Sequence, residues 1–188
     1  MDAMLQFVEG IEYLHSKQIA HIDIHRDNLV VGTCDTAAKH ESVVKNRIYI
    51  IDFDTSRQFS LGPGVQQAIT LPGTVQVPPN GLTSFDPYSW DVYCMGRTLE
   101  QVIRLVVLQG ARRGQDVYQR DEPPHWIAQK YIQWLVGNER LGGCTGVCRC
   151  RPTARAALRV LVVLRWAVYA EHEYPGIIET LSSSISTR

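Results

Sequence analysis

The side chains that could do chemistry gather in residues 21–28, with the sequence His-Ile-Asp-Ile-His-Arg-Asp-Asn. In this stretch a carboxylate, Asp23, is followed five residues later by a carboxamide, Asn28. A second carboxylate, Asp52, comes 24 residues after Asn28, at the end of the apolar run 48–51. Carboxylate and amide oxygens are the hard ligands that Mg²⁺ prefers. Asp23, Asn28 and Asp52 are therefore the residues of this chain whose types are considered first for chemistry.

More short motifs follow in order along the chain. They are Glu-Tyr-Leu-His-Ser-Lys at 12–17, Gly-Thr at 73–74, Pro-Pro-Asn at 78–80, Asp-Pro-Tyr-Ser-Trp-Asp-Val-Tyr-Cys-Met-Gly at 86–96 and Arg-Pro-Thr-Ala at 151–154. With His-Ile-Asp at 21–23 and Asp-Phe-Asp at 52–54, this order resembles the eukaryotic protein kinases, which carry His-Arg-Asp, Asp-Phe-Gly and a run opening their central helix at these places. The spacing between the Gly-Thr and Pro-Pro-Asn motifs is about one residue shorter than in that family.

The resemblance implies a role for each candidate residue. Asp23 would accept the proton of a substrate hydroxyl, and Asn28 and Asp52 would hold Mg²⁺ against the phosphates of ATP. His25 stands where serine/threonine kinases commonly carry a Lys that touches the transferred phosphate, and its protonated form could partly replace that Lys. The implied activity is transfer of the ATP γ-phosphate to a protein Ser or Thr, which is preferred to Tyr.

The resemblance covers residues 1–168, with an activation segment at about 52–80 and a C-terminal tail at 169–188. It corresponds only to the larger, helical lobe of a kinase. The Gly-rich loop, the strand Lys and its partner Glu would lie before Met1 and are absent from this sequence. We therefore expect the isolated lobe to be inactive and to need a smaller lobe or upstream sequence as its partner.

Three positions depart from the kinase pattern. Ile22 replaces the Arg that pairs with a phosphorylated activation segment, so a phosphate there would find no guanidinium at this place. Asp54 replaces the Gly of the metal-binding turn, where Gly allows a positive φ that Asp adopts only at a cost. Asn80 stands where a Glu would pair with Arg151, and an amide supplies no countercharge.

Two other functions remain open. A non-catalytic, pseudokinase-like scaffold would use the same fold as a protein-binding module, so the expected partner is either a protein substrate or a protein ligand. A metal hydrolase built on Asp23, His25, Asp27 and Asp52 would require metal-dependent turnover without a nucleotide.

Hydrophobic periodicity predicts a mainly α fold, a kinase-like larger lobe with a small β-hairpin-like region that carries the loop and the acidic turn. The expected helices lie at 2–16, from 86 onward, around 127–135 and from 154, and the expected strands at 29–31 and 48–51. Residues 33–46 and 55–89 are expected to be surface loops, and residues 109–125 a polar, broken stretch. Val102 and Val162 are among the apolar residues expected on buried helix faces.

The composition limits the class of protein. The chain has 188 residues, 45% of them apolar, which predicts a globular domain with a core. Lys plus Arg and Asp plus Glu number 19 each, which gives no electrostatic reason to expect nucleic acid or an anionic membrane as a partner. No apolar signal segment follows Met1, and the five cysteines are an odd number. We therefore expect reduced thiols and a cytoplasmic or nuclear location.

The cysteines, histidines and tryptophans admit other roles. Cys144, Cys148 and Cys150 could supply three thiolates to a zinc ion, with His125 or His172 as the fourth ligand. Reduced thiols in a surface loop are favoured over zinc, because structural zinc sites usually have a two-residue spacing between ligands. The remaining candidates are expected to be packing residues, namely His15, His21 and the tryptophans at 90, 126, 134 and 166.

Overall fold

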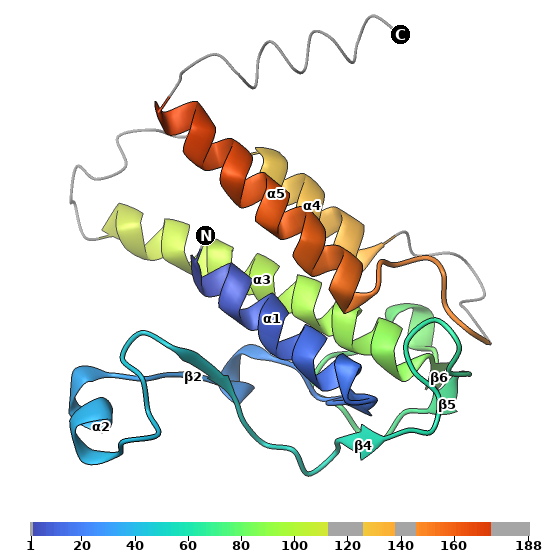
Figure 1. Ribbon diagram of the computed structural model, residues 1–188. Helices are drawn as coiled ribbons and strands as arrows, with labels where there is room; N and C mark the ends of the chain where they lie inside the picture. Colours follow the sequence, from blue (N-terminus) through green and yellow to red (C-terminus); the bar gives the residue numbers. More distant parts are fainter. Residues whose placement is uncertain (1, 113–125, 138–145, 174–188) are drawn as a thin grey trace, which may run out of the picture.

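The computed structural model describes residues 2–112, 126–137 and 146–173. Long helices gather on one side of the molecule and short strands on the other (Figure 1). The helices are α1 (Asp2–Ser16), α2 (Cys34–Lys39), α3 (Pro87–Arg112), α4 (Trp126–Val136) and α5 (Ala154–Glu173), with 3-10 turns at Arg26–Asn28 and Pro79–Gly81. The strands are β1 (Ile19–Ala20), β2 (Leu29–Val31), β3 (Ile48–Ile50), β4 (Arg57–Gln58), β5 (Ile69–Thr70) and β6 (Ser84–Phe85). The chain is thus mainly helical with small antiparallel sheets, which is compatible with the predicted fold class.

The strands form three antiparallel pairs, β1 with β4, β2 with β3 and β5 with β6. In the second pair Leu29 lies opposite Ile50, and the Ile51 N–H donates to the Asn28 carbonyl at 3.0 Å. An antiparallel register places the start of one strand beside the end of the other. The pair therefore brings the last residue of the loop at 21–28 next to the turn that begins at Ile51.

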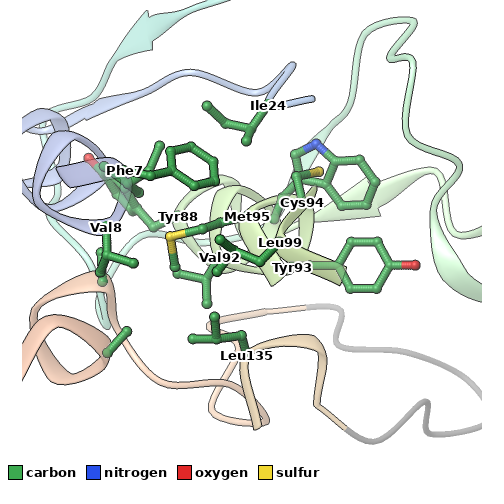
Figure 2. Close-up of a cluster of buried hydrophobic side chains, with 14 of the residues drawn as sticks. Phe7, Val8, Ile24, Tyr88, Val92, Tyr93, Cys94, Met95, Leu99 and Leu135 are labelled. Carbon is green, nitrogen blue, oxygen red and sulfur yellow. The ribbon is translucent and has the colours of Figure 1, made fainter. Parts of the chain in front are cut away.

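The core is built around α3. Trp90, Val92 and Met95 of this helix are all 0% exposed. Figure 2 shows side chains from α1, α3, α4 and the loop at 21–28 converging on Met95, whose unbranched chain fills the space between them. One continuous core therefore joins the helices to the loop that carries the candidate site.

Gly96 lets α3 and α4 approach closely. A Cβ at this position would lie 3.0 Å from the Leu135 Cβ, 3.0 Å from the Val136 Cγ2 and 3.2 Å from the Val136 backbone nitrogen. The missing side chain removes this conflict and offsets the cost of Gly inside a helix, which is about 1 kcal/mol relative to Ala.

Several local predictions are confirmed. The helix at 2–16 forms with Val8, Ile11 and Leu14 buried, and the strand at 29–31 has the predicted bounds. The second strand ends at Ile50, one residue earlier than predicted. Among the described residues, no helix has the length and apolar character needed to cross a membrane.

The prediction of a continuous surface loop at 33–46 is wrong, because it contains α2. Thr33 and Thr36 form a reciprocal cap: the Thr33 hydroxyl accepts from the Thr36 N–H at 3.1 Å, and the Thr36 hydroxyl accepts from the Thr33 N–H at 2.8 Å. Threonine at the third helical position can thus close a cap in place of the usual Glu or Gln.

The predicted helix limits also need correction. Helix α3 continues through Gly110 to Arg112, although the break was expected from residue 109. Helix α5 continues to Glu173, past the expected start of the tail at 169. Residues 113–125 and 174–188 lie outside the described part of the chain.

Several apolar residues expected in the core are exposed. Of the four tryptophans only Trp90 is buried, whereas Trp126, Trp134 and Trp166 are 56%, 40% and 68% exposed. Val102 and Val162 are 38% and 49% exposed. Position on a helix therefore did not decide burial for these residues.

Asp86 fixes the start of α3. Its Oδ1 accepts from the Tyr88 and Ser89 N–H groups at 3.0 and 3.3 Å, and its Oδ2 accepts from the Cys148 N–H at 3.1 Å. Burial raises the pKa of this carboxyl above its ordinary value of 3.8, and the three backbone hydrogen bonds oppose that rise only in part. One side chain therefore caps α3 and ties the segment before α5 to it.

Replacing Asp86 with Ala should lower the stability of the fold by about 2 kcal/mol, because a cap is lost and the Cys148 N–H loses its acceptor. The measurement is the urea midpoint with its slope checked for constancy. Because the folded-state pKa is raised, the stabilisation from Asp86 is full below the unfolded pKa and decreases as pH rises through the folded pKa. The loss should therefore be larger near pH 4 than at neutral pH.

A matched control is Asp2→Ala, which removes an exposed carboxylate paired with Arg165 at 2.9 Å at the start of α1. We expect a loss of under about 1 kcal/mol. Equal losses for both variants would contradict the role given to Asp86.

Candidate functional site

The loop at 21–28 is anchored by the carboxylate of Asp91 on α3. Its Oδ2 accepts from the His21 N–H at 2.8 Å, and its Oδ1 accepts from the Ile22 N–H at 2.7 Å. Asp91, His21 and Ile22 are each 0% exposed. Charge-assisted hydrogen bonds of this length are the strong class, so the loop backbone is fixed to the central helix.

His15 of α1 completes this anchor. Its Nε2 donates to the Asp91 Oδ2 at 3.0 Å, and its ring meets the Tyr88 ring edge-on with centroids 4.9 Å apart. Burial raises the pKa of Tyr88 to about 12, with nearby Asp86 and Asp91 adding to the rise. Asp91 thus joins α1, α3 and the loop through three N–H donors.

Ile22 has a strained backbone. Its φ is 74°, a left-handed conformation that is a genuine outlier for a β-branched residue. The Trp90 Nε1–H donates to the Ile22 carbonyl at 2.6 Å, and Asp91 accepts the Ile22 N–H. These two hydrogen bonds and the complete burial of the side chain hold the strained conformation in place.

His21 ties the acidic turn to the loop. Its Nε2 donates to the Ile51 carbonyl at 3.0 Å, and its ring centroid lies 4.9 Å from that of Phe53. The His21 carbonyl accepts from the hydroxyls of Thr55 at 3.0 Å and Ser56 at 3.3 Å. His15 and His21 are therefore both buried, hydrogen-bonded packing residues, as the sequence predicted.

Asp23 is hydrogen-bonded through one carboxylate oxygen and through its backbone carbonyl, and His25 lies near its other carboxylate oxygen. Its Oδ1 accepts from the Val75 N–H at 2.9 Å, and its Oδ2 lies 3.6 Å from the His25 Nε2. Its backbone carbonyl accepts from the Asn28 Nδ2 at 3.0 Å. The structure thus brings together three of the predicted site residues, Asp23, His25 and Asn28.

His25 lies between two carboxylates. Its Nδ1 is 3.9 Å from the Asp27 Oδ2, on the side opposite Asp23. The side chain of Asp27 is 71% exposed and that of His25 only 12%. The separations exceed hydrogen-bond length, so the imidazole is an electrostatic neighbour of both carboxylates rather than a bonded one.

Asp52 is placed by its backbone rather than by contacts of its side chain. It follows β3 with a φ of 63° and is exposed. The positive φ in this turn thus falls at Asp52, whereas Asp54, where it was expected, does not have one. Within the described residues the Asp52 carboxylate makes no hydrogen bond, so the structure positions it beside Asn28 without joining the two.

Asn28 and Asp52 at this edge carry the oxygen types that a hard divalent cation prefers. The amide nitrogen of Asn28 is used on the Asp23 carbonyl, which leaves its buried oxygen as a ligand, and the Asp52 carboxylate is open. One carboxylate and one amide oxygen suit Mg²⁺, which keeps waters and takes phosphate oxygens as its other ligands. In the part of the chain that the structure describes, no three His, Cys, Asp or Glu residues gather as a metal site.

The proposed thiol ligands are only partly described. Cys148 is buried and Cys150 is partly buried. Cys144, His125 and the side chain of His172 lie outside the described residues. Reduced thiols therefore remain the prediction for this segment.

Arg151 is held by two aromatic rings. Its guanidinium carbon lies 5.1 Å from the ring centroid of Phe85 and 5.0 Å from that of Tyr93, and its Nε donates to the Val136 carbonyl at 2.6 Å. Such cation–π contacts stabilise a guanidinium that is partly removed from water. The side chain of Asn80, its expected partner, lies outside the described residues.

Sequence reasoning missed the roles of two residues. Asp91 was recognised only as part of a helix motif, and Val75 was not singled out. Asp91 could have been found as the one acidic residue inside the apolar run 90–96, where a buried charge needs donors. Val75 acts through its backbone N–H, which side-chain type does not reveal.

The comparisons with known proteins agree with a kinase-like region. The chain is 31% identical over 101 residues to serine/threonine-protein kinase stk11 of Xenopus laevis, a match of 52% of this chain and 21% of that protein. It is 32% identical over 99 residues to mitogen-activated protein kinase kinase kinase 15 of Mus musculus, 50% of this chain and 6% of that protein. No family model matches the chain. The chain therefore contains a region distantly similar to protein kinases and spans about a fifth or less of these relatives.

Replacing Asp91 with Asn should lower the free energy of unfolding by about 3 kcal/mol. The reason is that the amide NH₂ group would face at least one of the three buried N–H groups that the carboxylate accepts. The readout is the urea midpoint together with hydrogen exchange of the His21 and Ile22 amides, which should lose protection. Asp35→Asn, an exposed carboxylate on α2, is the control and should change neither. Unchanged exchange at His21 and Ile22 in the Asp91 variant would show that the carboxylate does not anchor the loop.

Proposed function

We propose that this chain is the larger, helical lobe of a protein kinase-like domain, spanning residues 1–168. When joined to a smaller lobe it would transfer the ATP γ-phosphate to a Ser or Thr of a protein. The observation that carries the proposal is the loop anchored on Asp91, which places Asp23 and Asn28 beside the turn bearing Asp52. The distant similarity to serine/threonine kinases supports the same class of reaction.

Asp23 would act as the proton acceptor. Its Oδ1 is engaged by the Val75 N–H, so Oδ2 is the oxygen that can accept a proton from an incoming hydroxyl. The Asn28 amide, by donating to the Asp23 carbonyl, holds the backbone that carries this carboxylate. His25, 3.6 Å from Oδ2, supplies a polar group on the side of the acceptor oxygen and would contact the phosphate in its protonated form.

Asn28 and Asp52 would bind the nucleotide-associated Mg²⁺ through the Asn28 amide oxygen and the Asp52 carboxylate. Bound there, the cation would neutralise phosphate charge. Asp54 lies two residues after Asp52 in the same turn and is exposed. Its carboxylate would either add a ligand to the metal ion or repel the phosphates. This residue is the one at which the turn departs from the kinase pattern.

Exposed apolar residues of β2 and the following turn support docking of a smaller lobe there. Val30 and Val31 on β2 are 41% and 55% exposed, and Ile51 and Phe53 in the following turn are 39% and 47% exposed. Exposed apolar side chains near one another in the chain are commonly part of an interaction surface. Covering this edge would also enclose the nucleotide between the two lobes.

Specific observations also favour the second candidate, a non-catalytic protein-binding module. Ile22 occupies a position where a guanidinium would read a phosphorylated segment, and it is fully buried. A module that binds proteins through its helical surface needs no phosphate recognition.

The isolated chain should bind ATP–Mg²⁺ more weakly than about 1 mM, which corresponds to roughly 4 kcal/mol. Asn28 and Asp52 provide only the metal side of the site, and the missing lobe removes most of the buried surface for the base. Titration calorimetry on the 188-residue chain measures this directly, and micromolar binding would contradict it.

In a two-lobed protein, made by fusing the smaller lobe of a related kinase, Asp23→Asn should reduce phosphate transfer by about 100-fold or more. Asp52→Asn should reduce it as well, by weakening Mg²⁺ binding. Asp35→Asn is the matched control, because Asp35 lies on α2 away from the loop. Transfer to a generic protein substrate is the readout, and full activity in both site variants would remove the assignment.

If the parent fusion itself transfers no phosphate while its fold and ATP binding are intact, the non-catalytic candidate is favoured. The next step would then be to search for proteins that bind the helical surface of this chain. The two candidates are thus separated by the parent fusion before any variant is made.

A further inference from the structure

The outer side of helix α5 carries a row of side chains with the spacing of a coiled-coil seam. Successive members lie four, three, four and three residues apart, as the a and d positions of a heptad do. All of them are exposed, and the last three are 49%, 68% and 66% exposed. We call these five residues the outer stripe of α5: Arg155, Arg159, Val162, Trp166 and Tyr169.

The outer stripe lies away from the face that α5 buries in the core. Ala154, Ala157 and Leu161 of that buried face are 0%, 0% and 1% exposed, and α5 packs along α1 (Figure 1). A surface helix normally has one apolar row, which faces the core, and a polar opposite side. The outer stripe instead combines two arginines with a valine and two aromatic rings.

The two arginines stand where the helix alone does not favour them. Arg155 and Arg159 lie in the first two turns of α5, near the positive end of the helix dipole, and the first turn has no acidic residue. They are four residues apart, a spacing at which like charges repel. Residues 151–170 contain no Asp or Glu, and within the described residues neither arginine forms an ion pair. Both guanidinium groups are therefore available to a partner.

We propose that a second copy of this chain covers the outer stripe, with the two α5 helices antiparallel. The cationic half of the stripe, at 155–159, and its aromatic half, at 166–169, lie on either side of Val162. When one helix is reversed against the other, the guanidinium groups of each copy meet the aromatic rings of its partner, and Val162 lies near the two-fold axis. Guanidinium groups are attracted to the faces of Trp and Tyr rings. The stripe is thus self-complementary, as a two-fold interface requires.

The same type of contact already occurs inside the chain. The guanidinium carbon of Arg151 lies 5.0 Å from the ring centroid of Tyr93 and 5.1 Å from that of Phe85. A parallel arrangement of the two helices would lose this contact, because the arginines of the two copies would then face one another and repel. The charge pattern therefore selects the antiparallel arrangement.

The size of the stripe predicts a weak dimer. A buried Trp or Tyr contributes about 150–250 Å², so the four rings of a dimer supply on the order of 600–1,000 Å² at most. Interfaces below about 1,200 Å² in total belong to the weak, transient class. We therefore expect a dissociation constant of about 10–100 µM, with monomer and dimer exchanging as the concentration changes.

The test is sedimentation equilibrium of the full 188-residue chain from about 5 to 500 µM, a range that brackets this constant. The parent should pass from monomer to dimer. Trp166→Ser/Tyr169→Ser should raise the dissociation constant at least about 10-fold, since aromatic side chains at the centre of an interface supply most of its binding energy. Arg155→Glu/Arg159→Glu should raise it by a similar factor, because carboxylates would then meet the negative faces of the rings.

Mixing the parent with Arg155→Glu/Arg159→Glu tests the direction of the helices. In the antiparallel dimer the mixture should contain no more dimer than the parent alone, because one of the two arginine–aromatic clusters is lost. In a parallel dimer the new glutamates would face the arginines of the parent, and the mixed dimer would predominate. Predominance of the mixed dimer would therefore overturn the antiparallel arrangement.

A matched control removes two exposed apolar side chains outside α5. Val44 and Val77 are 60% and 76% exposed, and Val44→Ser/Val77→Ser should leave the dissociation constant unchanged. Far-UV circular dichroism should show the helical content of the parent in every variant. A parent that stays monomeric up to about 500 µM would overturn the proposal and leave a helix of another protein as the occupant. So would a dimer that Trp166→Ser/Tyr169→Ser does not weaken, since another surface would then hold it.

Discussion

A single buried carboxylate holds the candidate site to the fold. Asp91 receives N–H groups from His15 on α1 and from His21 and Ile22 in the loop, over sequence separations of 69 to 76 residues. Removing a carboxylate from water costs several kcal/mol, and only well-placed donors offset that cost. The side chain is therefore stable at this place only when helix, loop and α3 are assembled together, which makes the geometry of the loop a property of the whole core rather than of its own sequence.

This constraint explains why the loop tolerates a strained residue. The left-handed backbone of Ile22 would cost of order 1–3 kcal/mol in a free chain. Here the Ile22 N–H donates to Asp91, and the Ile22 carbonyl accepts from the Trp90 indole. Two neighbouring residues of α3 thus hold both backbone polar groups of Ile22. The direction in which Asp23 leaves the loop follows from that conformation. A polar anchor deep in the core thus sets the position of a partly exposed carboxylate.

The sequence predicted what depends on local pattern and missed what depends on packing. The helix at 2–16 and the strand at 29–31 follow from periodicity within a few turns of chain, and both have the predicted bounds. The exposure of Trp166 depends instead on which neighbours reach the outer side of α5, and no periodicity within the helix encodes that. The bond from Val75 to Asp23 spans 52 residues and uses a backbone N–H, so residue type carries no signal for it. The sequence therefore shows which residue types are available for the candidate site, but it does not show which groups form hydrogen bonds with them.

The contact between Val75 and Asp23 bears on both candidate functions. A carboxylate that accepts an N–H through one oxygen loses none of its charge and keeps the other oxygen for a proton, so the contact orients Asp23 without disabling it. The same bond fixes residues 73–77 against the loop, and the hydroxyl of Thr74 turns to the Gln76 carbonyl at 2.8 Å instead. A catalytic lobe would use this bond to position its base, and a scaffold would use it to rigidify a surface. In both cases the hydrogen bond depends on the backbone of Val75 and not on its side chain. The side chains of Val75 and Val77 are exposed to solvent.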